Sequence, residues 1–546
     1  MVKIIPLGGS DRVTKNLFVY EYQDEQLIVD CGIGFPEQEM LGVDLLIPDV
    51  SYLVKNPKKI HGIVLTHGHD DHIAGLPYIL PQLGQVPIFA SKLTAGFVKD
   101  TLADFKIAAQ VEIIKETDQL ELGSFKIEPI HVTHSVPDSF HLAIHTPAGL
   151  IYHGSDFKFD LTPVDGWSSN FQKIAQLGNQ GVLCLLSDCL RVERPGFSLS
   201  ESTLKDNFTR EIRKSKGRFI VTTISSNLHR LQQAVDVAVS FGRKIAFVGR
   251  SMEKNIQTAS QLGFFRLPKK MIINKKKIND FPAHQVAVMI AGSQGQTNSS
   301  LVRAANNQHP FIRFGSGDRV IFSSDPIPGN EQSVHRTIDQ LLRLGTDVVY
   351  SEVTEDLHVS GHASQGDLKL LIELLKPQYL IPIGGSFRHL HFYRRLAQEM
   401  GYQKNQTFIL RDGEAIEFDQ AGKTQIKKAV ELKDIFVDGS RIGDVGPVVL
   451  ADRQKLAQDG IVIIAVPFNQ QNQQPVGEPE VISRGFVFMK TSGRLIEEIK
   501  TQIKTHYAQK VLDMAKFRNQ IETDIYSLLL SETGRKPLIL CVLVKV

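Results

Sequence analysis

The sequence predicts a multidomain α/β protein, and three observations along the chain support this fold class. Short apolar runs alternate with Gly- and Asp-rich turns through about the first 160 residues, as in a β-rich domain. From about residue 200 the pattern changes to repeated alternation of strand and helix. The last part of the chain predicts a small α+β unit. A chain of 546 residues has room for about two to four domains.

Composition excludes several classes of protein. Hydrophobic residues make up 42% and charged residues 22% of the chain, and the formal net charge is only +3. This balance gives no overall attraction for nucleic acid, although a local basic groove is compatible with it. The four cysteines are scattered without a CxxC pair, which argues against a disulfide framework and a cysteine-bound zinc. No apolar run approaches the roughly 18 residues of a membrane span, so we expect a cytoplasmic protein.

The first and middle parts of the chain predict different sheets. In the first part, residues 16–32 predict two strands joined by a polar turn, and "HGIVLTH", "GSFKIEPIHVTHS", "HLAIHTPAGLIYHGSDF" and "GVLCLLSDC" predict further strands. Loops with polar residues and histidines follow these strands. In the middle part, helices such as "NLHRLQQAVDVAVSFG" alternate with strands such as "RKIAFVG". That alternation is typical of a parallel, doubly wound sheet.

The C-terminal part is predicted to begin after a linker. The stretch Ala421–Lys433 is polar and carries several lysines, which favours a linker. Beyond it, "GIVIIAVPF", "SRGFVFMK" and "KPLILCVLVKV" predict strands, and a helical pattern runs from about Ser492 to Leu530.

The segment "IVLTHGHDDHIAG" carries the strongest chemical signal. His67 and His69 are two residues apart, so in an extended chain both side chains point the same way. The turn that follows can bring Asp71 and His72 to a second position nearby. Imidazole and carboxylate groups suit zinc, and two metal ions about 3.5–4 Å apart can activate water and hold both oxygens of a phosphate displacement. Four coordinating residues directly after an apolar strand favour this interpretation over a solvated polar turn.

Further ligands must come from other strand ends. His134 and Asp156 each follow a predicted strand and precede a polar loop. Either residue alone would be interpreted as a cap or turn residue, but together with the first cluster they are candidate ligands. Asp30 also ends a strand. It either orients a ligand histidine or is a plain turn aspartate.

An ordered set of motifs resembles the ribonuclease J family. In chain order the motifs are "HGHDDH", "THSVPDS", "GSDFKFD", "LLSDC" followed by "ERPGF", "VGRSM", "AGSQG", "SSDPIPGNE" and "HVSGHASQ". HxHxDH alone marks only the wider superfamily, whereas the ordered set marks the family over about residues 1–430. The resemblance implies a metallo-β-lactamase αββα sandwich with an inserted β-CASP doubly wound α/β domain and a small α+β C-terminal domain. The implied boundaries are 1–200 and 356–430 for the metallo-β-lactamase domain, 201–355 for the β-CASP domain, 431–455 for a linker and 456–546 for the C-terminal domain.

The resemblance also implies roles for individual residues. One zinc ion would be held by His67, His69 and His134, and the other by Asp71 and His72, with Asp156 bridging them. Asp71, Asp188 and His362 are the catalytic candidates, with His362 near the scissile phosphate. Mn²⁺ or Mg²⁺ could serve in activity.

The resemblance implies contacts to RNA and a structural cation site as well. The RNA-contacting residues would be His358, Val359, Ser360, Gly361 and His362 in one loop, and Ser293, Gln294, Ser226 and Asn227 in the β-CASP domain. Backbone N–H groups in such Gly-rich turns suit anions. The cation site, suited to Ca²⁺, would use Asp44 and Asp438.

One expected metal ligand is missing. The family has a histidine in a "PIHGE" pattern, whereas "PIGGSF" in this chain puts Gly384 and Ser386 in the places of the histidine and the glutamate. Glycine has no side chain to coordinate a metal, so we expect the second ion to bind weakly and water activation to be reduced. His389 and His391 follow on a predicted helix, where we do not expect them to substitute.

Other departures lie in neighbouring motifs. Gln296 stands where the family usually has glutamate, and Cys189, Leu190 and Arg191 stand where smaller polar residues are usual. These departures resemble the low-activity second paralogue that many Gram-positive bacteria carry beside an active paralogue, with which it associates.

Three functions are compatible with the sequence. The first is a weak metal-dependent ribonuclease of RNA processing and decay, which removes nucleotides from the 5′ end or cuts internally. It would work in a hetero-oligomer with an active paralogue, or as a homodimer or homotetramer. The second is a noncatalytic subunit that binds RNA and stabilises its partner. The third is a small-molecule metallo-hydrolase, which HxHxDH permits but the long α/β insert argues against.

Overall fold

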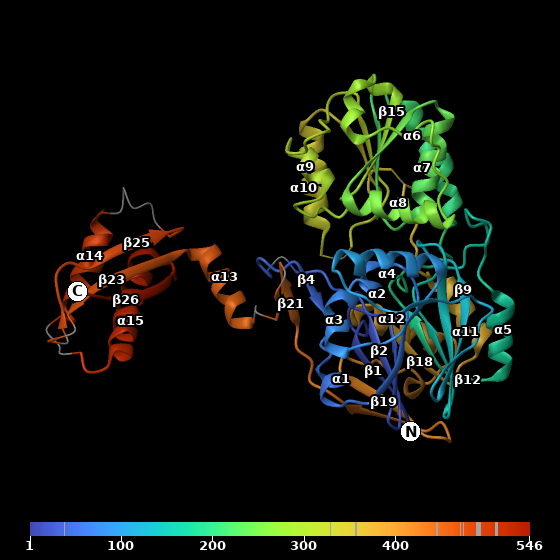
Figure 1. The fold of residues 1–546 in the computed structure, drawn as a ribbon, viewed down its shortest axis with the longest axis horizontal. Helices are drawn as coiled ribbons and strands as arrows, with labels where there is room; N and C mark the ends of the chain where they lie inside the picture. Colours follow the sequence, from blue (N-terminus) through green and yellow to red (C-terminus); the bar gives the residue numbers. More distant parts are fainter. Residues whose placement is uncertain are drawn as a thin grey trace. The chain divides into compact units, whose positions relative to one another are not determined.

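The computed structural model describes the whole chain except residues 38, 328, 355–356, 440, 444–445, 470, 473, 487–492 and 508–510. The chain forms two compact units (Figure 1). The first comprises Met1–Phe35 and Leu46–Ile435, and the second comprises Pro36–Leu45 and Phe436–Val546. Every predicted site residue except Asp44 and Asp438 therefore belongs to the first unit.

Two β-sheets pack face to face in the first unit and share one hydrophobic core. The larger sheet has the order β20-β19-β1-β2-β3-β5-β6-β7, and the smaller has the order β18-β12-β11-β10-β9-β8. Strands of the larger sheet are β1 (Val2–Gly8), β2 (Leu17–Tyr22), β3 (Glu25–Val29), β5 (Lys59–Val64), β6 (Ile88–Ala90), β7 (Val111–Ile113), β19 (Glu414–Phe418) and β20 (Thr424–Lys428). Strands of the smaller sheet are β8 (Leu120–Leu122), β9 (Phe125–Val132), β10 (Ser139–Thr146), β11 (Gly149–Gly154), β12 (Val182–Asp188) and β18 (Tyr379–Ile383).

Helices cover the outer faces of both sheets (Figure 1). Apolar residues of α5, α11 and α12 form a second core against the smaller sheet. The helices of this part are α1 (Ser51–Lys55), α2 (Asp70–Ile73), α3 (Leu76–Leu83), α4 (Lys92–Asp104), α5 (Phe171–Gln180), α11 (Gln365–Leu375) and α12 (Phe387–Glu399). This layering confirms the predicted αββα sandwich.

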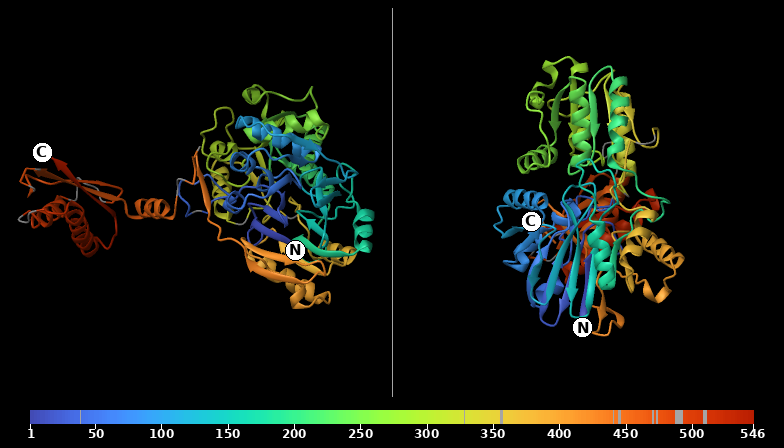
Figure 2. Two further views of the ribbon diagram at one scale, coloured as in Figure 1. Left: turned by 60° about the horizontal axis from the view of Figure 1, so that its bottom comes forward. Right: turned by 90° about the vertical axis from the view of Figure 1, so that its right-hand side faces the viewer.

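The middle of the chain forms a separate five-stranded sheet with the order β14-β15-β13-β16-β17. All its strand pairs are parallel, as the alternation of strand and helix predicts. In Figures 1 and 2 helices flank the sheet on both faces. The strands are β13 (Phe219–Thr222), β14 (Lys244–Val248), β15 (Val286–Ile290), β16 (Arg319–Phe322) and β17 (Asp347–Val349). The helices are α6 (Leu204–Lys214), α7 (Leu228–Ser240), α8 (Arg250–Leu262), α9 (Ser300–Ala305) and α10 (Glu331–Arg343).

The second unit contains a small mixed sheet built around β23, which pairs antiparallel with β24 and β25 and parallel with β26. Apolar residues of α14 and α15 pack against this sheet. Its elements are α13 (Pro447–Asp459), β23 (Ile461–Asn469), β24 (Gln474–Pro475), β25 (Glu480–Arg484), α14 (Gly493–Lys504), α15 (Met514–Thr533) and β26 (Leu538–Lys545).

The region expected to be a linker contains regular structure. Within residues 421–433, β20 pairs with β19 at the edge of the larger sheet, and Lys427 forms an ion pair with Glu417. Two of the lysines, Lys427 and Lys428, therefore belong to an exposed edge strand, where charge discourages further pairing. Residues 431–455 contain β21 (Ile435–Asp438), β22 (Arg441–Ile442) and the start of α13. In the tail, the strand expected at "SRGFVFMK" begins earlier, as β25, and residues 487–490 lie outside the described part.

Candidate metal centre and substrate cavity

The coordinating residues of the first motif follow β5, in the interior of the larger sheet. After β5 the chain stays extended through His69, which is the N-cap residue of α2. The four-residue helix α2, where a turn was expected, carries Asp71 and His72. His134 follows β9 and Asp156 follows β11, both in the smaller sheet. The metal-binding candidates therefore come from neighbouring strand ends of two different sheets.

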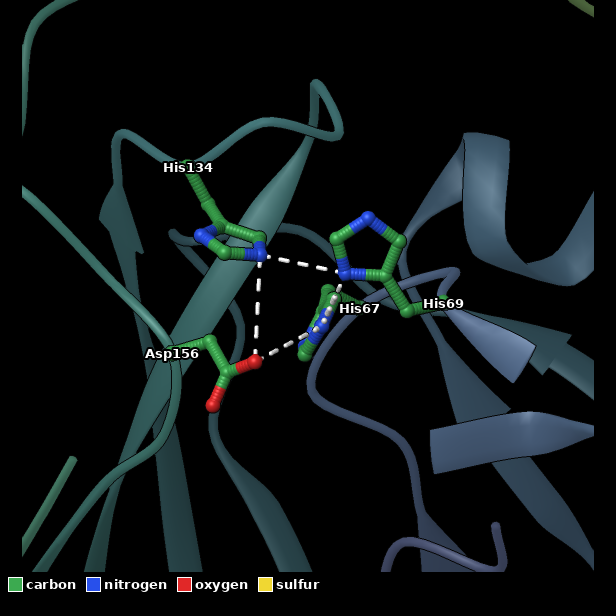
Figure 3. Close-up of side chains that lie close together, drawn as sticks. All are labelled: His67, His69, His134 and Asp156. Atoms are coloured by element: carbon green, nitrogen blue, oxygen red, sulfur yellow. Dashed lines mark hydrogen bonds and ion pairs between the residues drawn. The ribbon is translucent and has the colours of Figure 1, made fainter. Parts of the chain in front are cut away.

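Three imidazoles and one carboxylate converge on a single point (Figure 3). Nδ1 of His69 lies 3.0 Å from Nε2 of His67 and 3.1 Å from Nε2 of His134. Oδ2 of Asp156 lies 3.7 Å from Nε2 of His67 and 3.8 Å from Nε2 of His134. Donors bound to one tetrahedral zinc ion lie about 3.3 Å apart. The donor set and its spacing therefore fit a zinc-sized ion.

The other ring nitrogen of each histidine has a hydrogen-bonding neighbour. His134 Nδ1 is 2.8 Å from the carbonyl oxygen of Gly361, and His67 Nδ1 is 3.0 Å from Oγ1 of Thr66. His69 Nε2 is 3.1 Å from Oγ of Ser135. Such contacts set the tautomer and the orientation of metal-binding imidazoles. Because Thr66 and Ser135 carry no motif signal of their own, the sequence did not identify them.

Asp30 lies directly behind His72. Its Oδ2 is 2.7 Å from Nδ1 of His72, and its Oδ1 accepts a hydrogen bond of 2.8 Å from the backbone N–H of Thr66. Its backbone has a φ of +62°, in the left-handed region where aspartate is one of the tolerated residues. Of the two roles left open from sequence, this geometry is that of a residue that orients a histidine.

His72 and Asp71, which were predicted to hold a second metal ion, lie close to Asp156. Nε2 of His72 lies 3.5 Å from Oδ2 of Asp156 and 3.7 Å from Oδ2 of Asp71. The amide nitrogen of Asn16, which sequence reasoning did not identify, lies 3.1 Å from the same Nε2 and also donates to the carbonyl oxygen of Asp71. Among the described residues, the donor atoms that do lie within 4.8 Å of one another beside the first group belong to Asp156, Asp188 and His362, not to the predicted set.

Gly384 lies beside Asp156 and Asp188. Residue Ile383 at the end of β18 pairs with Asp188 at the end of β12, so Gly384 follows next to the catalytic candidates. A Cβ atom built on Gly384 would lie 3.9 Å from a carboxylate oxygen of Asp156 and 3.9 Å from one of Asp188. A side chain at this position would therefore point between the two carboxylates.

The two nearby histidines lie on α12. The Nδ1 atom of His389 accepts a hydrogen bond of 3.2 Å from the backbone N–H of Ser386, in the first turn of the helix. Its Nε2 lies 3.1 Å from a guanidinium nitrogen of Arg388 and 3.6 Å from Oε2 of Glu193. Neither His389 nor His391 belongs to a group of metal-binding donors among the described residues.

Asp188 and His362 form an ion pair at the edge of the metal centre. Oδ2 of Asp188 lies 2.9 Å from Nδ1 of His362, which in turn lies 4.0 Å from Oδ2 of Asp156. Burial lowers the pKa of His362, but the charges of Asp188 and Asp156 outweigh it and raise this pKa to about 9. In the absence of a metal ion, His362 therefore carries a proton at neutral pH.

The other four histidines of the metal centre differ in the direction in which their pKa is shifted. Burial lowers the pKa of His67 and His69 well below the usual range and that of His134 to about 3. These rings are neutral and can bind a cation without losing a proton. For His72, burial is outweighed by Asp30, Asp156 and Asp71, whose charges raise its pKa above the usual value.

A cavity of about 1070 Å³ opens onto the metal centre. It is lined by residues of the two-sheet sandwich and of the domain with the five-stranded parallel sheet. Its wall includes His69, Asp71, Asp156, His362 and Gly384. It also includes the remaining residues of the predicted RNA-contacting set, namely Ser226, Asn227, Ser293, Gln294, His358, Val359, Ser360 and Gly361. The structure thus brings the predicted RNA-contacting residues and the metal centre to one cavity.

Arg230 of α7 holds the loop of residues 358–362. Its guanidinium donates to the carbonyl oxygens of Val359 and Ser323, each at 2.6 Å, and lies 2.8 Å from Nδ1 of His358. It also forms two hydrogen bonds with the buried carboxylate of Glu201, at 2.8 and 2.9 Å. No sequence motif pointed to Arg230, because it occupies an ordinary helical position.

The two aspartates predicted for a structural cation site have partners within the protein. Asp438 pairs with Arg453 at 2.6 Å, and Asp44 accepts a hydrogen bond of 2.8 Å from the backbone N–H of Gly439. Among the described residues, these two aspartates belong to no group that could hold a metal ion.

Among the residues that the structure describes, no helix is long and apolar enough to cross a membrane.

Four family profiles match consecutive parts of the chain. They are described as "Metallo-beta-lactamase superfamily" for residues 11–147, "Ribonuclease J, beta-CASP domain" for 216–341, "Zn-dependent metallo-hydrolase RNA specificity domain" for 348–409 and "Ribonuclease J C-terminal domain" for 448–546. The predicted site residues of the first unit fall in the first three segments, except Asp156 and Asp188, which lie between the first and the second.

Full-length relatives and one solved structure agree with these profiles. The chain is 38% identical to "Ribonuclease J 1" of Streptococcus pyogenes, over 99% of this chain and 97% of the relative. It is 35% identical to "Ribonuclease J2" of Bacillus subtilis, over 100% of this chain and 99% of the relative. A crystal structure of a protein of unknown function from Enterococcus faecalis shares the fold over 76% of this chain and 99% of its own, with a TM-score of 0.54 at 15% identity. The chain therefore belongs to the ribonuclease J family.

Proposed function

We propose that this chain is a metal-dependent ribonuclease that hydrolyses RNA phosphodiester bonds, from the 5′ end or internally, with low intrinsic activity. The observation that supports it most is the convergence of three neutral imidazoles and Asp156 on the wall of a cavity that the RNA-contacting candidates also line. A metal centre beside a large cavity suits hydrolysis of a phosphodiester bond, because a metal ion can bind phosphate oxygens and activate water.

Each group of the site has a part in this proposal. His67, His69, His134 and Asp156 would hold a metal ion, which would supply Lewis-acid polarisation of a phosphate oxygen and of the attacking water. His362, which Asp188 keeps protonated and oriented, stabilises charge on the phosphate and gives a proton to the leaving oxygen. The loop of residues 358–362 holds the substrate beside His362. Zn²⁺ suits the first position, and Mn²⁺ or Mg²⁺ could occupy the second during activity.

Low activity is proposed because of Gly384. The second position has His72, Asp71 and the shared Asp156 but lacks the side chain that would complete it. The chain is 38% and 35% identical to the two named relatives, so overall identity does not distinguish between them. The resemblance to a low-activity paralogue therefore rests on the site residues. The same observation favours a second candidate function, in which the chain binds RNA and its partner without catalysis.

The substitution Gly384→His tests both candidates. The backbone φ of +69° is one that histidine tolerates better than most residues, and a Cβ finds only ordinary contacts at 3.9 Å. We expect the variant to bind a second metal ion per chain and to degrade 5′-monophosphorylated RNA at least about tenfold faster. Metal counting by plasma mass spectrometry and a single-turnover assay measure the two effects.

Gly384→Ala is the matched control, because it adds a Cβ with the same backbone strain but no ligand. It should change neither metal content nor rate. A second ion without faster cleavage in Gly384→His would support the noncatalytic subunit. If the histidine attracted no further metal ion, the proposal of an incomplete second position would be wrong.

We also propose that the second unit mediates association with an active ribonuclease J paralogue or with a second copy of the chain, as a dimer or tetramer. One face of its sheet packs against helices, whereas the outward residues of β26 are apolar and exposed: Leu540 by 47%, Val542 by 40% and Val544 by 44%. Apolar patches of this kind commonly mark protein interfaces.

A further inference from the structure

We infer that Arg191 binds a backbone phosphate of RNA beside His362, and so supplies positive charge near the incomplete metal position. This inference rests on the proposed function. Arg191 lines the same cavity as His362 and Gly384. It follows Asp188 by three residues, in the turn after β12.

The turn that carries Arg191 is firmly held. The backbone N–H of Val192 donates to the carbonyl oxygen of Cys189, and that of Arg194 donates to the carbonyl oxygen of Arg191. The side-chain amide of Gln365, at the start of α11, donates to the carbonyl oxygen of Val192 at 2.9 Å. Because both the backbone and its neighbour in α11 are fixed, the guanidinium needs little further ordering to meet a ligand.

The guanidinium of Arg191 has no partner in the part of the chain that the structure describes. Its Nε is buried without a hydrogen bond, although the side chain as a whole is only half-buried. The neighbouring Arg388 differs, because it lies 3.4 Å from the carboxylate of Glu193. A partly desolvated guanidinium whose nearby carboxylates make no hydrogen bond to it is left partly uncompensated, so an anion bound from the cavity would supply the missing contact.

Charged groups around the cavity act on Arg191. Burial lowers the pKa of Arg191, and the charge of Asp325, followed by that of Asp188, opposes this. Burial also lowers the pKa of His358, and the positive charges of Arg230 and Arg191 lower it further. Arg191 therefore lies within electrostatic range of both Asp188 and the loop of residues 358–362.

A phosphate is the anion that fits this position. A guanidinium can donate two parallel hydrogen bonds to phosphate oxygens, and it keeps its charge at any physiological pH. At this position it would compensate part of the phosphate charge that a fully bound second metal ion would otherwise neutralise. Arg191 would then bind the substrate phosphate in a chain where Gly384 supplies no metal ligand.

Binding of RNA without turnover tests the inference. We would measure fluorescence anisotropy of a labelled single-stranded RNA 10-mer with the full chain in EDTA, at several salt concentrations. For Arg191→Gln we expect roughly tenfold weaker binding, as for loss of a charge-assisted hydrogen bond, and a salt slope smaller by about 0.7. Arg191→Lys should keep the salt slope but lose part of the affinity. Arg343→Gln removes the same charge from an exposed position on α10 and should bind like the wild type.

The outcomes separate this inference from the proposed function. If the wild-type chain binds no RNA, the proposed function fails and the inference fails with it. If the wild type binds RNA but Arg191→Gln matches it in affinity and salt slope, only the inference is overturned. Should Arg191→Gln fail to fold, Arg191→Lys decides the question, because unchanged affinity in that variant would contradict a two-bond contact to phosphate.

Discussion

At the scale of single residues, the orientation of His72 depends on Asp30. One carboxylate oxygen of Asp30 faces Nδ1 of His72, and the other accepts from the backbone of Thr66. Asp30→Asn keeps the shape and the tolerance of a positive φ but removes the charge. Asp30 also accepts a hydrogen bond from Oγ1 of Thr66, which contacts Nδ1 of the zinc-ligand candidate His67, so we expect the chain to lose about 10- to 100-fold in zinc affinity, measured by competition with a chelator.

Asp138→Asn is the control for this change. Asp138 is also a buried aspartate with a positive φ, but it accepts a hydrogen bond from the backbone N–H of Leu93 rather than facing a ligand histidine. Its variant should lower stability without changing zinc affinity. Equal affinity losses in both variants would show that Asp30 acts through general stability alone.

At the scale of elements, α7 and the 358–362 loop are joined by one buried arginine. The N-cap residue Asn227 starts α7 so that Arg230 lies in its first turn, within reach of Glu201 and Val359. The charges of Arg230 and Lys158 lower the pKa of Glu201, against the effect of burial, which raises it. Glu201 therefore stays ionised in the interior only while its cationic partners are present.

Arg230→Met leaves this carboxylate without its two hydrogen bonds. Removing one partner of a buried ion pair costs about 3–5 kcal/mol, so we expect a loss of that order in the free energy of unfolding, measured in urea. The double variant Glu201→Gln, Arg230→Met removes the charge as well and should recover part of the loss. A loss below about 1 kcal/mol in the single variant would mean that Lys158 alone neutralises Glu201.

At the scale of the whole molecule, the proposed association would depend on the outer face of the small sheet. Val542→Lys puts a charge at the centre of the exposed apolar positions of β26. We expect it to abolish assembly, as seen by light scattering coupled to size-exclusion chromatography, while the fold remains, because the side chain already faces water. Leu161→Lys makes the same kind of change at an exposed position of the first unit and should leave the assembled state intact. Unchanged mass for Val542→Lys would locate the interface elsewhere.

Much of the architecture was predictable because periodicity is a local property. The alternating strands and helices of residues 200–350 predicted a parallel sheet, and the structure contains one. The polar stretch at residues 421–433 was misinterpreted, since an exposed edge strand and a linker have the same composition. Its pairing with β19 is a contact between strands, which local composition does not reveal.

The sequence by itself determined which donors are present and which one is missing. Histidine and aspartate at His67, His69, His134 and Asp156 are chemical identities, and so is the absent side chain of Gly384. Tertiary structure alone decided that these donors meet, because three strand ends of two sheets bring them to one point. It also decided the roles of Arg230 and Thr66, and it left Arg191 unpaired among the described residues. Hydrogen bonds between distant segments depend on where the fold places each residue, and the residue type alone does not reveal this.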